Sequence, residues 1–580
     1  MSIILGIHSG HESSAVVFKN GGLLAAISEE RLTRIKNDGG RVPDRSIDKV
    51  LEMAGISRAD VDRLALLYTF FPEEYFIRET FLKEAERKLS RLRRRLKGEK
   101  RPLILLENLL TRLLSRGKHF DDHFLQKKML KGEKFDALTN VRFYDHHDAH
   151  ALPAAYYSGF ERAAVFTMDG NGDFNISHTS SIYESGRLNR LYASSKLGTS
   201  AGLFYSHITR LLGFMPLRHE GKVIGLAAYG DPSILYKQFS KALRLSPDGR
   251  TLDSDFAGLP DAETNRYNFL KEAITGHSRE DISAAAQQVL EDVVLALVRN
   301  FLSETGADHV ALNGGVFANV KLNQRISELP EVKEVFIFPA MSDTGNSIGA
   351  VLLDLMTHDP QLFDRMKQPL DSVYWGPEYD KDYIEAELIN SGLHFSRKSE
   401  DEILQIAAGA IHSGQVVGWF QGRMEFGPRA LGNRSILARP TDVSINDWLN
   451  KRLERSEFMP FAPSVLEEHA DEIFIGVEKA RRTAAFMTIT FDVRSDWRSR
   501  IPAVVHIDGT SRPQLVTKKA NPLYHKLIRT YYEMSGIPLV LNTSFNVHEE
   551  PIVCSPKEAI KAFMDKRVDC LAIDRFWLEH

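Results

Sequence analysis

Short apolar runs that end in glycine, asparagine, aspartate or serine recur along this chain, and they constrain its fold more than any other feature. In the first part of the sequence such runs occupy residues 163–168, 310–312 and 335–338, and each leads into a polar loop or a helix-like segment. Strand-like runs return at residues 416–420, 482–491 and 538–541, with helical patterns between them. Strands that alternate with helices are typical of α/β proteins, so we expect an α/β fold throughout.

The amino-terminal residues predict a three-strand meander. Apolar runs at residues 3–7, 15–18 and 23–27 are separated by the polar turn 8–14 and by Gly21-Gly22. Runs of this length between turn residues are typical of strands joined in hairpins. A helix is expected after them, over residues 46–54.

The length of 580 residues exceeds what one hydrophobic core can serve, so we expect at least two domains. Hydrophobic periodicity weakens over residues 355–383, where Pro360 and Pro377 interrupt the pattern. We place the domain boundary there. The predicted domains are residues 1–360 and 375–580.

A helical insertion is expected at residues 72–138, which are rich in charge and carry leucines at helical spacing. Its segment 88–101 is strongly basic. A basic helix can bind a polyanion such as nucleic acid. Charge runs are more often the solvated face of a helix, and we favour that interpretation.

The overall charge gives no attraction to nucleic acid or to anionic membranes, since 74 basic and 77 acidic side chains leave a formal net charge of −3. Cys554 and Cys570 lie in no CxxC or Cys/His cluster, so we expect buried thiols in a reducing compartment. The first residues lack the regions of a signal peptide, and no run approaches the roughly 18 apolar residues of a membrane span. We expect a cytoplasmic protein.

Two histidines four residues apart, His146 and His150, predict a shared metal. On a helix both imidazoles project from one face, one turn apart. Unliganded histidines packed at a polar helix start explain the pair equally well. Asp343 follows an apolar run and precedes the apolar helix that Gly349 opens, so it is either a third metal ligand or a helix N-cap.

Glycine-bearing loops after two strand-like runs predict contacts to a nucleotide. Glycines let backbone amides approach an anion, and a nearby acid can hold a phosphate-bound cation, although an Asp/Gly-rich hairpin has the same composition. The residues concerned are Asp169, Gly170, Asn171 and Gly172 in the first loop and Asn313, Gly314, Gly315 and Asn319 in the second.

Three arginines lie among glycines in one short segment, at Arg423, Arg429 and Arg434. Guanidinium groups bind phosphate or carboxylate bidentately, and glycine keeps the approach open. Surface arginines paired with neighbours are the alternative. We favour an anion site.

Taken together, these motifs resemble the actin-like ATPase superfamily, and within it the O-carbamoyltransferases typified by nodulation protein U and by antibiotic-tailoring enzymes. The resemblance covers nearly the whole chain. It rests on the segments 10–15, 28–31, 146–151, 219–230 and 313–316, and on 422–436, 506–514 and 541–546 in the second half. The chain departs from the family pattern at Glu12, where Asp is frequent, and at Glu549, where Gly is usual.

The resemblance implies a two-lobed actin-like domain followed by a smaller YrdC-like α/β domain. It implies that His146, His150 and Asp343 hold one metal, commonly iron, although zinc or manganese would accept the same ligands. Carbamoyl phosphate and ATP, with its magnesium, are expected to give carbamoyl-adenylate in the second domain. Lys451 and Arg512 match positions at the phosphates there, and Asn542 and Ser544 belong to the same nucleotide site.

The carbamoyl group is then expected to pass to an acceptor hydroxyl at the metal, with His11 as the base that takes the hydroxyl proton. A hydrogen-bonded turn histidine is the alternative role for His11. Sugars and natural-product alcohols are the favoured acceptors. A hydroxymethylated base in DNA, a tRNA threonylcarbamoyl-type reaction and an ATP-gated binding protein without enzyme activity stay open, as does a homodimer.

Overall fold

The first sheet carries the amino terminus of the chain. The computed structural model describes residues 2–68, 141–454 and 460–580. Its first sheet has the strand order β3-β2-β1-β4-β5. The strands are β1 (Ile3–His8), β2 (Ser14–Lys19), β3 (Gly22–Ser28), β4 (Arg63–Leu67) and β5 (Val141–Tyr144). Strands β1 to β3 form the expected antiparallel meander, and β4 and β5 run parallel to β1.

A second sheet repeats the topology of the first. Its order is β12-β11-β6-β7-β8, where β6, β7 and β8 form an antiparallel meander and β11 and β12 run parallel to β6. These strands are β6 (Arg162–Met168), β7 (His178–Glu184), β8 (Arg187–Ser194), β11 (His309–Asn313) and β12 (Glu334–Ile337). This duplicated arrangement is the two-lobed actin-like fold that the motifs imply, and the residues alone did not reveal the repeat.

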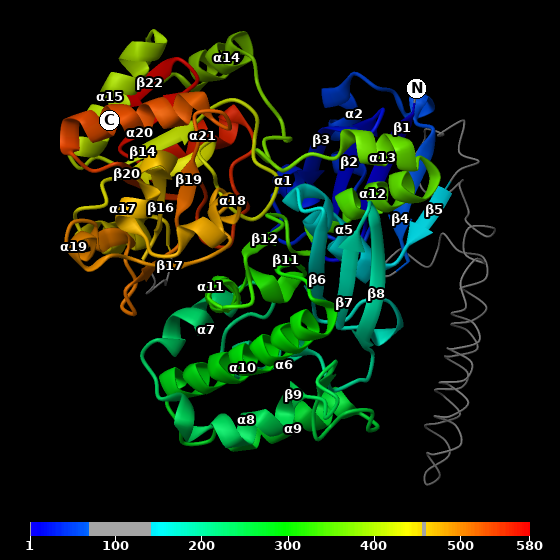
Figure 1. Cartoon of the computed structure of the whole chain (residues 1–580). Helices are drawn as coiled ribbons and strands as arrows, with labels where there is room; N and C mark the ends of the chain where they lie inside the picture. The colour runs from blue at the N-terminus through cyan, green and yellow to red at the C-terminus, as the bar shows by residue number, and fades with distance from the viewer. Residues whose placement is uncertain (1, 69–140, 455–459) are drawn as a thin grey trace, which may run out of the picture.

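Two helices lie between the two sheets and pack on one another. Helix α5 (His146–Ser158) packs on β6 and β11, and α12 (Asn346–His358) packs on β1 and β4. A Cβ atom on Gly349 would lie 1.8 Å from the carbonyl oxygen of Ala149, so only glycine permits this approach. The pair is visible between the blue and cyan strands in Figure 1.

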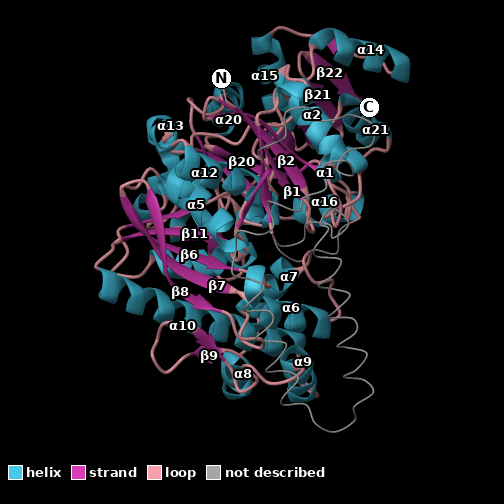
Figure 2. Cartoon of the chain, turned by 90° about the vertical axis from the view of Figure 1, so that its right-hand side faces the viewer, coloured by secondary structure: helices cyan, strands magenta, loops and turns pink. Residues whose placement is uncertain are grey.

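A helical lobe is inserted between β8 and β11, and it lies at the bottom of Figures 1 and 2. The long helix α10 starts at the cap Ser278, whose side chain accepts from the Asp281 amide, and it ends at Gly306 with a left-handed φ of 66°. The lobe comprises α6 (Ala201–Leu211), α7 (Glu220–Ala227), α8 (Tyr236–Ala242), α9 (Ala262–Ala273), α10 (Arg279–Thr305), β9 (Arg244–Leu245) and β10 (Leu252–Asp253). No helix in the described ranges is long and apolar enough to cross a membrane.

The carboxy-terminal part is built on a third sheet, of order β13-β22-β21-β14-β15-β20-β16-β19. Its strands are β13 (Ser396–Arg397), β14 (Val417–Phe420), β15 (Arg434–Ala438), β16 (Ala462–Leu466), β19 (Gln514–Val516), β20 (Leu539–Ser544), β21 (Cys570–Ile573) and β22 (Phe576–Glu579). The main helices are α14 (Lys381–Ser391), α15 (Glu400–His412), α16 (Ser444–Arg452), α20 (Pro522–Ser535) and α21 (Pro556–Met564). Mixed α/β structure is thus present in both halves.

Shorter elements complete the described chain. They are α1 (Glu29–Thr33), α2 (Asp44–Ala54), α11 (Val320–Ser327), α13 (Pro360–Met366), α17 (Ala470–Ile473), α18 (Arg481–Ala484), α19 (Ser495–Arg498), β17 (Phe491–Asp492) and β18 (Thr510–Ser511). The helix expected at 46–54 is confirmed as part of α2. The insertion expected at 72–138, with its basic segment 88–101, lies outside the described residues.

The strand expected at residues 482–491 is wrong for most of its length, because α18 occupies its start. The Thr483 hydroxyl donates to the Val335 carbonyl at 2.9 Å and accepts from the Ile337 amide at 3.1 Å. The Thr483 side chain therefore satisfies backbone groups at the edge of β12.

The two halves of the chain are in direct contact. A buried guanidinium, that of Arg31, donates to the Gly427 carbonyl at 3.0 Å, and Arg34 donates to the carbonyls of Pro551 and Ile552. The chain passes between the halves through α13 and the stretch before α14. The domain limits given above remain a prediction.

Candidate functional site

Helix α5 carries both histidines of the HxxxH pair on one face, as predicted. Its cap is Asp145, whose side chain accepts from the Asp148 amide, and Asp173 accepts from the His146 amide at 2.8 Å. The rings of His146 and His150 have centroids 4.7 Å apart. Gly172 leaves room for the His146 and His147 rings, since a Cβ there would lie 2.6 Å from the first and 2.9 Å from the second.

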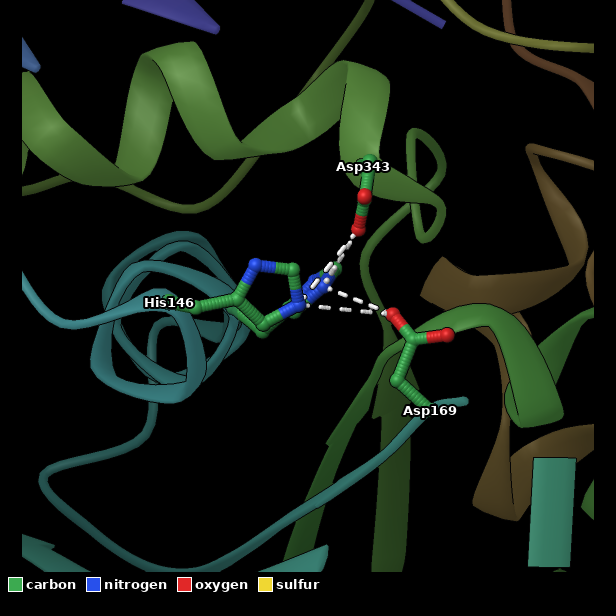
Figure 3. Close-up of side chains that lie close together, drawn as sticks. His146, Asp169 and Asp343 are labelled. Atoms are coloured by element: carbon green, nitrogen blue, oxygen red, sulfur yellow. Dashed lines mark hydrogen bonds and ion pairs between the residues drawn. The ribbon is translucent and has the colours of Figure 1, made fainter. Parts of the chain in front are cut away.

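Two carboxylates converge on these imidazoles. The Nε2 of His150 lies 3.1 Å from Asp169 Oδ2 and 3.1 Å from Asp343 Oδ1. The Nε2 of His146 lies 3.6 Å and 3.5 Å from the same two oxygens. Figure 3 shows that the side chains of Asp169 and Asp343 both point toward the imidazoles.

The sheets explain why the two aspartates meet. Asp169 directly follows β6, while Asp343 follows β12 by several residues and begins a short 3-10 helix that leads into α12. Both strands run parallel through β11, so their carboxyl ends lie at one edge. Ser342 stands at the cap position of that short helix, so the N-cap alternative for Asp343 is not realised.

The charges in this group stabilise one another. Burial lowers the pKa of His150, but its hydrogen bonds to Asp169 and Asp343 outweigh burial and raise that pKa to about 9. The pKa of Asp169 is held well below its usual range by His146 and His150, against the effect of burial. The protein therefore keeps both carboxylates ionised at neutral pH.

A second ring of polar side chains surrounds the group. The buried His8 of β1 has its Nε2 3.6 Å from Asp343, and burial lowers its pKa to about 4, so it is neutral. The Asn346 amide nitrogen lies 3.1 Å from His150 Nε2. His11 Nδ1 lies 3.4 Å from Asp343.

Sequence reasoning placed only some of these residues at the group. It assigned Asp169 to a nucleotide loop and overlooked His8 and Asn346. His8 precedes His11 by three residues, and Asn346 follows Asp343 by three. This closeness in sequence suggests a place near the site, but it does not show whether the side chains point toward the metal-binding group.

The residues present fit a metal ion. Ligand atoms of His146, His150, Asp169 and Asp343 all lie within 4.8 Å of one another, and the group is almost entirely buried. A metal ion among these atoms would bind each of them at roughly 2.0–2.2 Å, and the spacing of the ligand atoms is compatible with such bonds. Two imidazoles with carboxylates are ligands that iron(II), zinc and manganese accept.

A cavity of about 790 Å³ lies beside this group and is walled by both halves of the chain. It collects many of the residues predicted from the sequence. Those in its wall are His11, Asp169, Gly170, Gly315, Asn319, Asp343, Arg429, Arg512, Asn542 and Ser544.

Glu549 lines one side of the cavity and joins the carboxy-terminal half of the chain to the helical lobe. Its carboxylate accepts from Arg218 at 2.8 Å and lies 2.8 Å from His219 Nε2, and both partners come from the helical lobe. The residue has a left-handed φ of 63°, a conformation that favours glycine. The departure from the family pattern at this position therefore supplies an ionic contact.

Two glycine-loop residues support α5 and β6 instead of lining the cavity. Asn313 donates to the His150 carbonyl at 2.6 Å, and Gly314 has a φ of 102° with the Met168 carbonyl oxygen 2.3 Å from where its Cβ would be. Asn171 and Gly172 are likewise absent from the described wall. Asn313 thus holds the backbone of α5, and Gly314 permits the close approach to the end of β6.

The expected cluster of three arginines is not formed. Arg434 is fully buried, stacks on Phe420 at 3.7 Å, and donates to four backbone carbonyls. Arg423 donates to the carbonyls of Leu24, Trp375 and Gly376. Both guanidinium groups thus hold backbone segments together, and only Arg429 reaches the cavity.

Lys451 lies on α16 with an exposed side chain, outside the wall that the described residues form. Its phosphate role stays a prediction. Arg512, in contrast, lines the cavity on the loop that follows Asp508.

Comparison with known proteins identifies two family matches. The model named Carbamoyltransferase N-terminus matches residues 3–352, and the model named Carbamoyltransferase C-terminus matches residues 408–580. The chain is 35% identical to nodulation protein NolNO of Sinorhizobium fredii, over 98% of this chain and 79% of that one. It is 33% identical to nodulation protein U of the same species, over 46% of each chain.

Among solved structures, full-length HypF in its phosphate- and nucleotide-bound form aligns with 62% of this chain and 56% of its own length. The sequence identity is 13% and the TM-score is 0.34.

Proposed function

This chain belongs to the carbamoyltransferase family and is a carbamoyltransferase, and we propose that it acts as an ATP-dependent O-carbamoyltransferase. Carbamoyl phosphate and ATP give carbamoyl-adenylate at the carboxy-terminal wall of the cavity. The acceptor hydroxyl then attacks the carbamoyl carbon at the His/Asp group, a new C–O bond forms, and AMP leaves.

The single observation that carries this proposal is the shared cavity. One wall holds Asp169 and Asp343 of the His/Asp group, and the opposite half supplies Arg429 and Arg512. A carbamoyl-adenylate is labile in water, so formation and use within one enclosed space is an advantage. The cavity volume of about 790 Å³ is in the range of small-molecule sites.

The metal-binding residues in this proposal are His146, His150, Asp169 and Asp343. A bound metal, iron(II) in our proposal, supplies Lewis-acid polarisation of a carbonyl oxygen. Asn346 and His8 lie beside the ligands, where the Asn346 amide contacts the His150 Nε2 that faces the carboxylates and His8 Nε2 lies 3.6 Å from Asp343 Oδ2. ATP, with magnesium, is the proposed nucleotide.

At the carboxy-terminal wall, Arg429 and Arg512 are the proposed phosphate ligands, since guanidinium binds phosphoryl oxygens bidentately. Asn542 lies in the same wall, where its amide donates to Ala430 O and Ser464 Oγ and so holds the loop of Arg429. Lys451 is kept as a further phosphate ligand that would have to approach from α16.

The acceptor is proposed to be a sugar or another natural-product alcohol. A mass-spectrometric screen of sugars, antibiotic alcohols, nucleosides and hydroxymethyl-DNA tests this, and the expected product is heavier by one carbamoyl group. Products formed with tRNA or DNA alone would contradict the proposal.

Incubation of the full chain with ATP and carbamoyl phosphate tests the reaction itself. We expect pyrophosphate release that requires both substrates, and AMP release that requires an acceptor as well. If the chain hydrolysed ATP to ADP at the same rate with and without carbamoyl phosphate, the result would instead support an ATP-gated binding protein without transferase activity.

His11 is proposed to orient and deprotonate the acceptor hydroxyl, because its ring lies in the cavity wall beside Asp343. We expect His11→Ala to lower transfer by roughly 10²–10⁴-fold, the usual contribution of a general base. Metal content and pyrophosphate release should stay at wild-type levels. Loss of metal in this variant would make His11 a ligand, and unchanged transfer would leave it without a catalytic role.

A further inference from the structure

A histidine and an aspartate form a hydrogen-bonded pair in the carboxy-terminal wall of the cavity, away from the His/Asp group. His506 Nδ1 lies 3.0 Å from Asp508 Oδ1. Both residues line the cavity, on the same loop as Arg512. The loop is a tight hairpin, in which the His506 amide donates to the Thr510 carbonyl and the Gly509 amide donates to the His506 carbonyl.

The carboxylate of this pair is fixed from both halves of the chain. Asp508 Oδ1 also accepts from the Thr510 amide at 3.0 Å and from the Thr510 hydroxyl at 2.6 Å. Asp508 Oδ2 lies 3.1 Å from the ammonium of Lys321, which comes from α11 beside the second sheet. An ionised carboxylate held in this way determines the tautomer of its histidine, with the proton on Nδ1.

The other ring nitrogen of His506 is the notable atom. Nε2 is buried and has no hydrogen-bond partner in the part of the chain that the structure describes. The side chain is only 12% exposed, in the wall of a cavity. A buried polar atom without a partner is costly in a folded protein, and a catalytic role is one explanation for such an atom. With the proton on Nδ1, Nε2 presents a lone pair, which is what a general base requires.

The proposed reaction needs such a base. Carbamoyl phosphate and ATP give carbamoyl-adenylate, pyrophosphate and phosphate only if one water molecule is consumed. The His/Asp group is occupied with transfer in the proposed function, so the water must be activated elsewhere. The loop of His506 also carries Arg512, our phosphate ligand.

We propose that His506 is the general base of this water-consuming step and that Asp508 positions it. The inference rests on the proposed function. Nε2 takes a proton from water, the water oxygen bonds to the phosphorus of carbamoyl phosphate, and the bond from phosphorus to the carbamoyl oxygen breaks. Inorganic phosphate and carbamate result. A carbamate oxygen then attacks the α-phosphorus of ATP and pyrophosphate leaves, while the proton on His506 returns to solvent.

The test separates the water-consuming step from adenylation. His506→Asn keeps a donor close to the position of Nδ1 for Asp508 and removes Nε2. Two rates are measured on the full chain: pyrophosphate release from carbamoyl phosphate and ATP, and exchange of labelled pyrophosphate into ATP with added ammonium carbamate. We expect the first to fall by roughly 10²–10⁴-fold and the second to stay within about threefold of wild type.

His412→Asn is the matched control, because His412 is exposed at the end of α15. It should leave both rates unchanged. Equal losses of both rates in His506→Asn would assign His506 to nucleotide binding or folding and overturn the inference, and so would unchanged rates. If the wild-type chain releases no pyrophosphate with carbamoyl phosphate, the proposed function itself fails, which is a separate result.

Two further measurements constrain the step. In ¹⁸O-water the wild-type chain should place one labelled oxygen in inorganic phosphate, and label in the carbamoyl product would overturn the attack on phosphorus. Asp508→Asn should lower the rate with carbamoyl phosphate and preserve the exchange with carbamate. Asp508→Glu, which keeps the carboxylate, should recover part of the lost rate, and a merely structural role for Asp508 would affect both rates together.

Discussion

Replacing His150 by alanine is expected to lower carbamoyl transfer strongly and to remove the bound metal, while pyrophosphate release from carbamoyl phosphate and ATP continues. The imidazole of His150 contacts both Asp169 and Asp343 at 3.1 Å, so its loss leaves His146 as the one imidazole that still contacts both carboxylates in the described residues. We expect transfer to fall by on the order of 10³-fold, as when an oxyanion-stabilising group is removed. Metal content by plasma mass spectrometry and product by chromatography measure the two effects.

Asp169→Asn distinguishes a metal ligand from a nucleotide contact. The amide keeps the shape of the side chain and removes its charge. We expect metal affinity to fall by at least the roughly 10–100-fold that loss of an outer-shell partner causes. A variant that keeps its metal and loses affinity for ATP would return Asp169 to the nucleotide loop.

His147→Gln is the control for both variants. His147 adjoins His146 but points away from the group, with Nδ1 at 2.7 Å from Thr167 Oγ1 and Nε2 at 2.8 Å from the Ile176 carbonyl. Burial lowers its pKa to about 3, so it is a neutral packing histidine. The variant should lose stability and keep its metal.

Metal bound at wild-type levels in His150→Ala would contradict the assignment of the site.

The part of the site that the sequence predicted follows from local geometry. Helical periodicity alone places His146 and His150 on one face, and the structure has them there. The sequence offered Asp343 as a third ligand or a helix N-cap, and only the family resemblance favoured the ligand, because Asp343 lies 193 positions after His150. Asp169 ended in the same group because β6 and β12 are both parallel to β11, a pairing that no local pattern encodes.

The arginine segment shows the opposite case. Arg423, Arg429 and Arg434 are close in sequence, and the charge pattern predicted one shared anion. Each guanidinium instead binds the acceptors that lie nearest to it. Arg434 donates to carbonyls of its own loop and to that of Pro377, and Arg423 donates to the carbonyl of Leu24 in β3. Which acceptors lie within reach depends on tertiary packing, so composition could not separate them.

Gly349→Ala is expected to destabilise the chain and to disassemble the metal group at the same time. Alanine normally stabilises a helix interior by roughly 0.5–1 kcal/mol relative to glycine. Here the new Cβ would lie 1.8 Å from the Ala149 carbonyl oxygen and 2.7 Å from its Cα, which are backbone atoms that cannot rotate away. Helices α5 and α12 must therefore separate, at a cost of about 3 kcal/mol, the upper part of the range for overpacking.

The consequence for the site follows from where its ligands originate. His146 and His150 lie on α5, whereas Asp343 immediately precedes α12, so a shift between the helices changes the distance between imidazoles and carboxylate. Metal affinity should fall together with the denaturation midpoint, although Gly349 is no ligand. Gly409→Ala in α15 is the matched control, since outside its own helix turn no atom of the described residues lies within 4 Å of the added Cβ, and it should raise the midpoint slightly. If Gly349→Ala behaved like Gly409→Ala in urea and kept its metal, the close packing of α5 on α12 would not be what aligns the ligands.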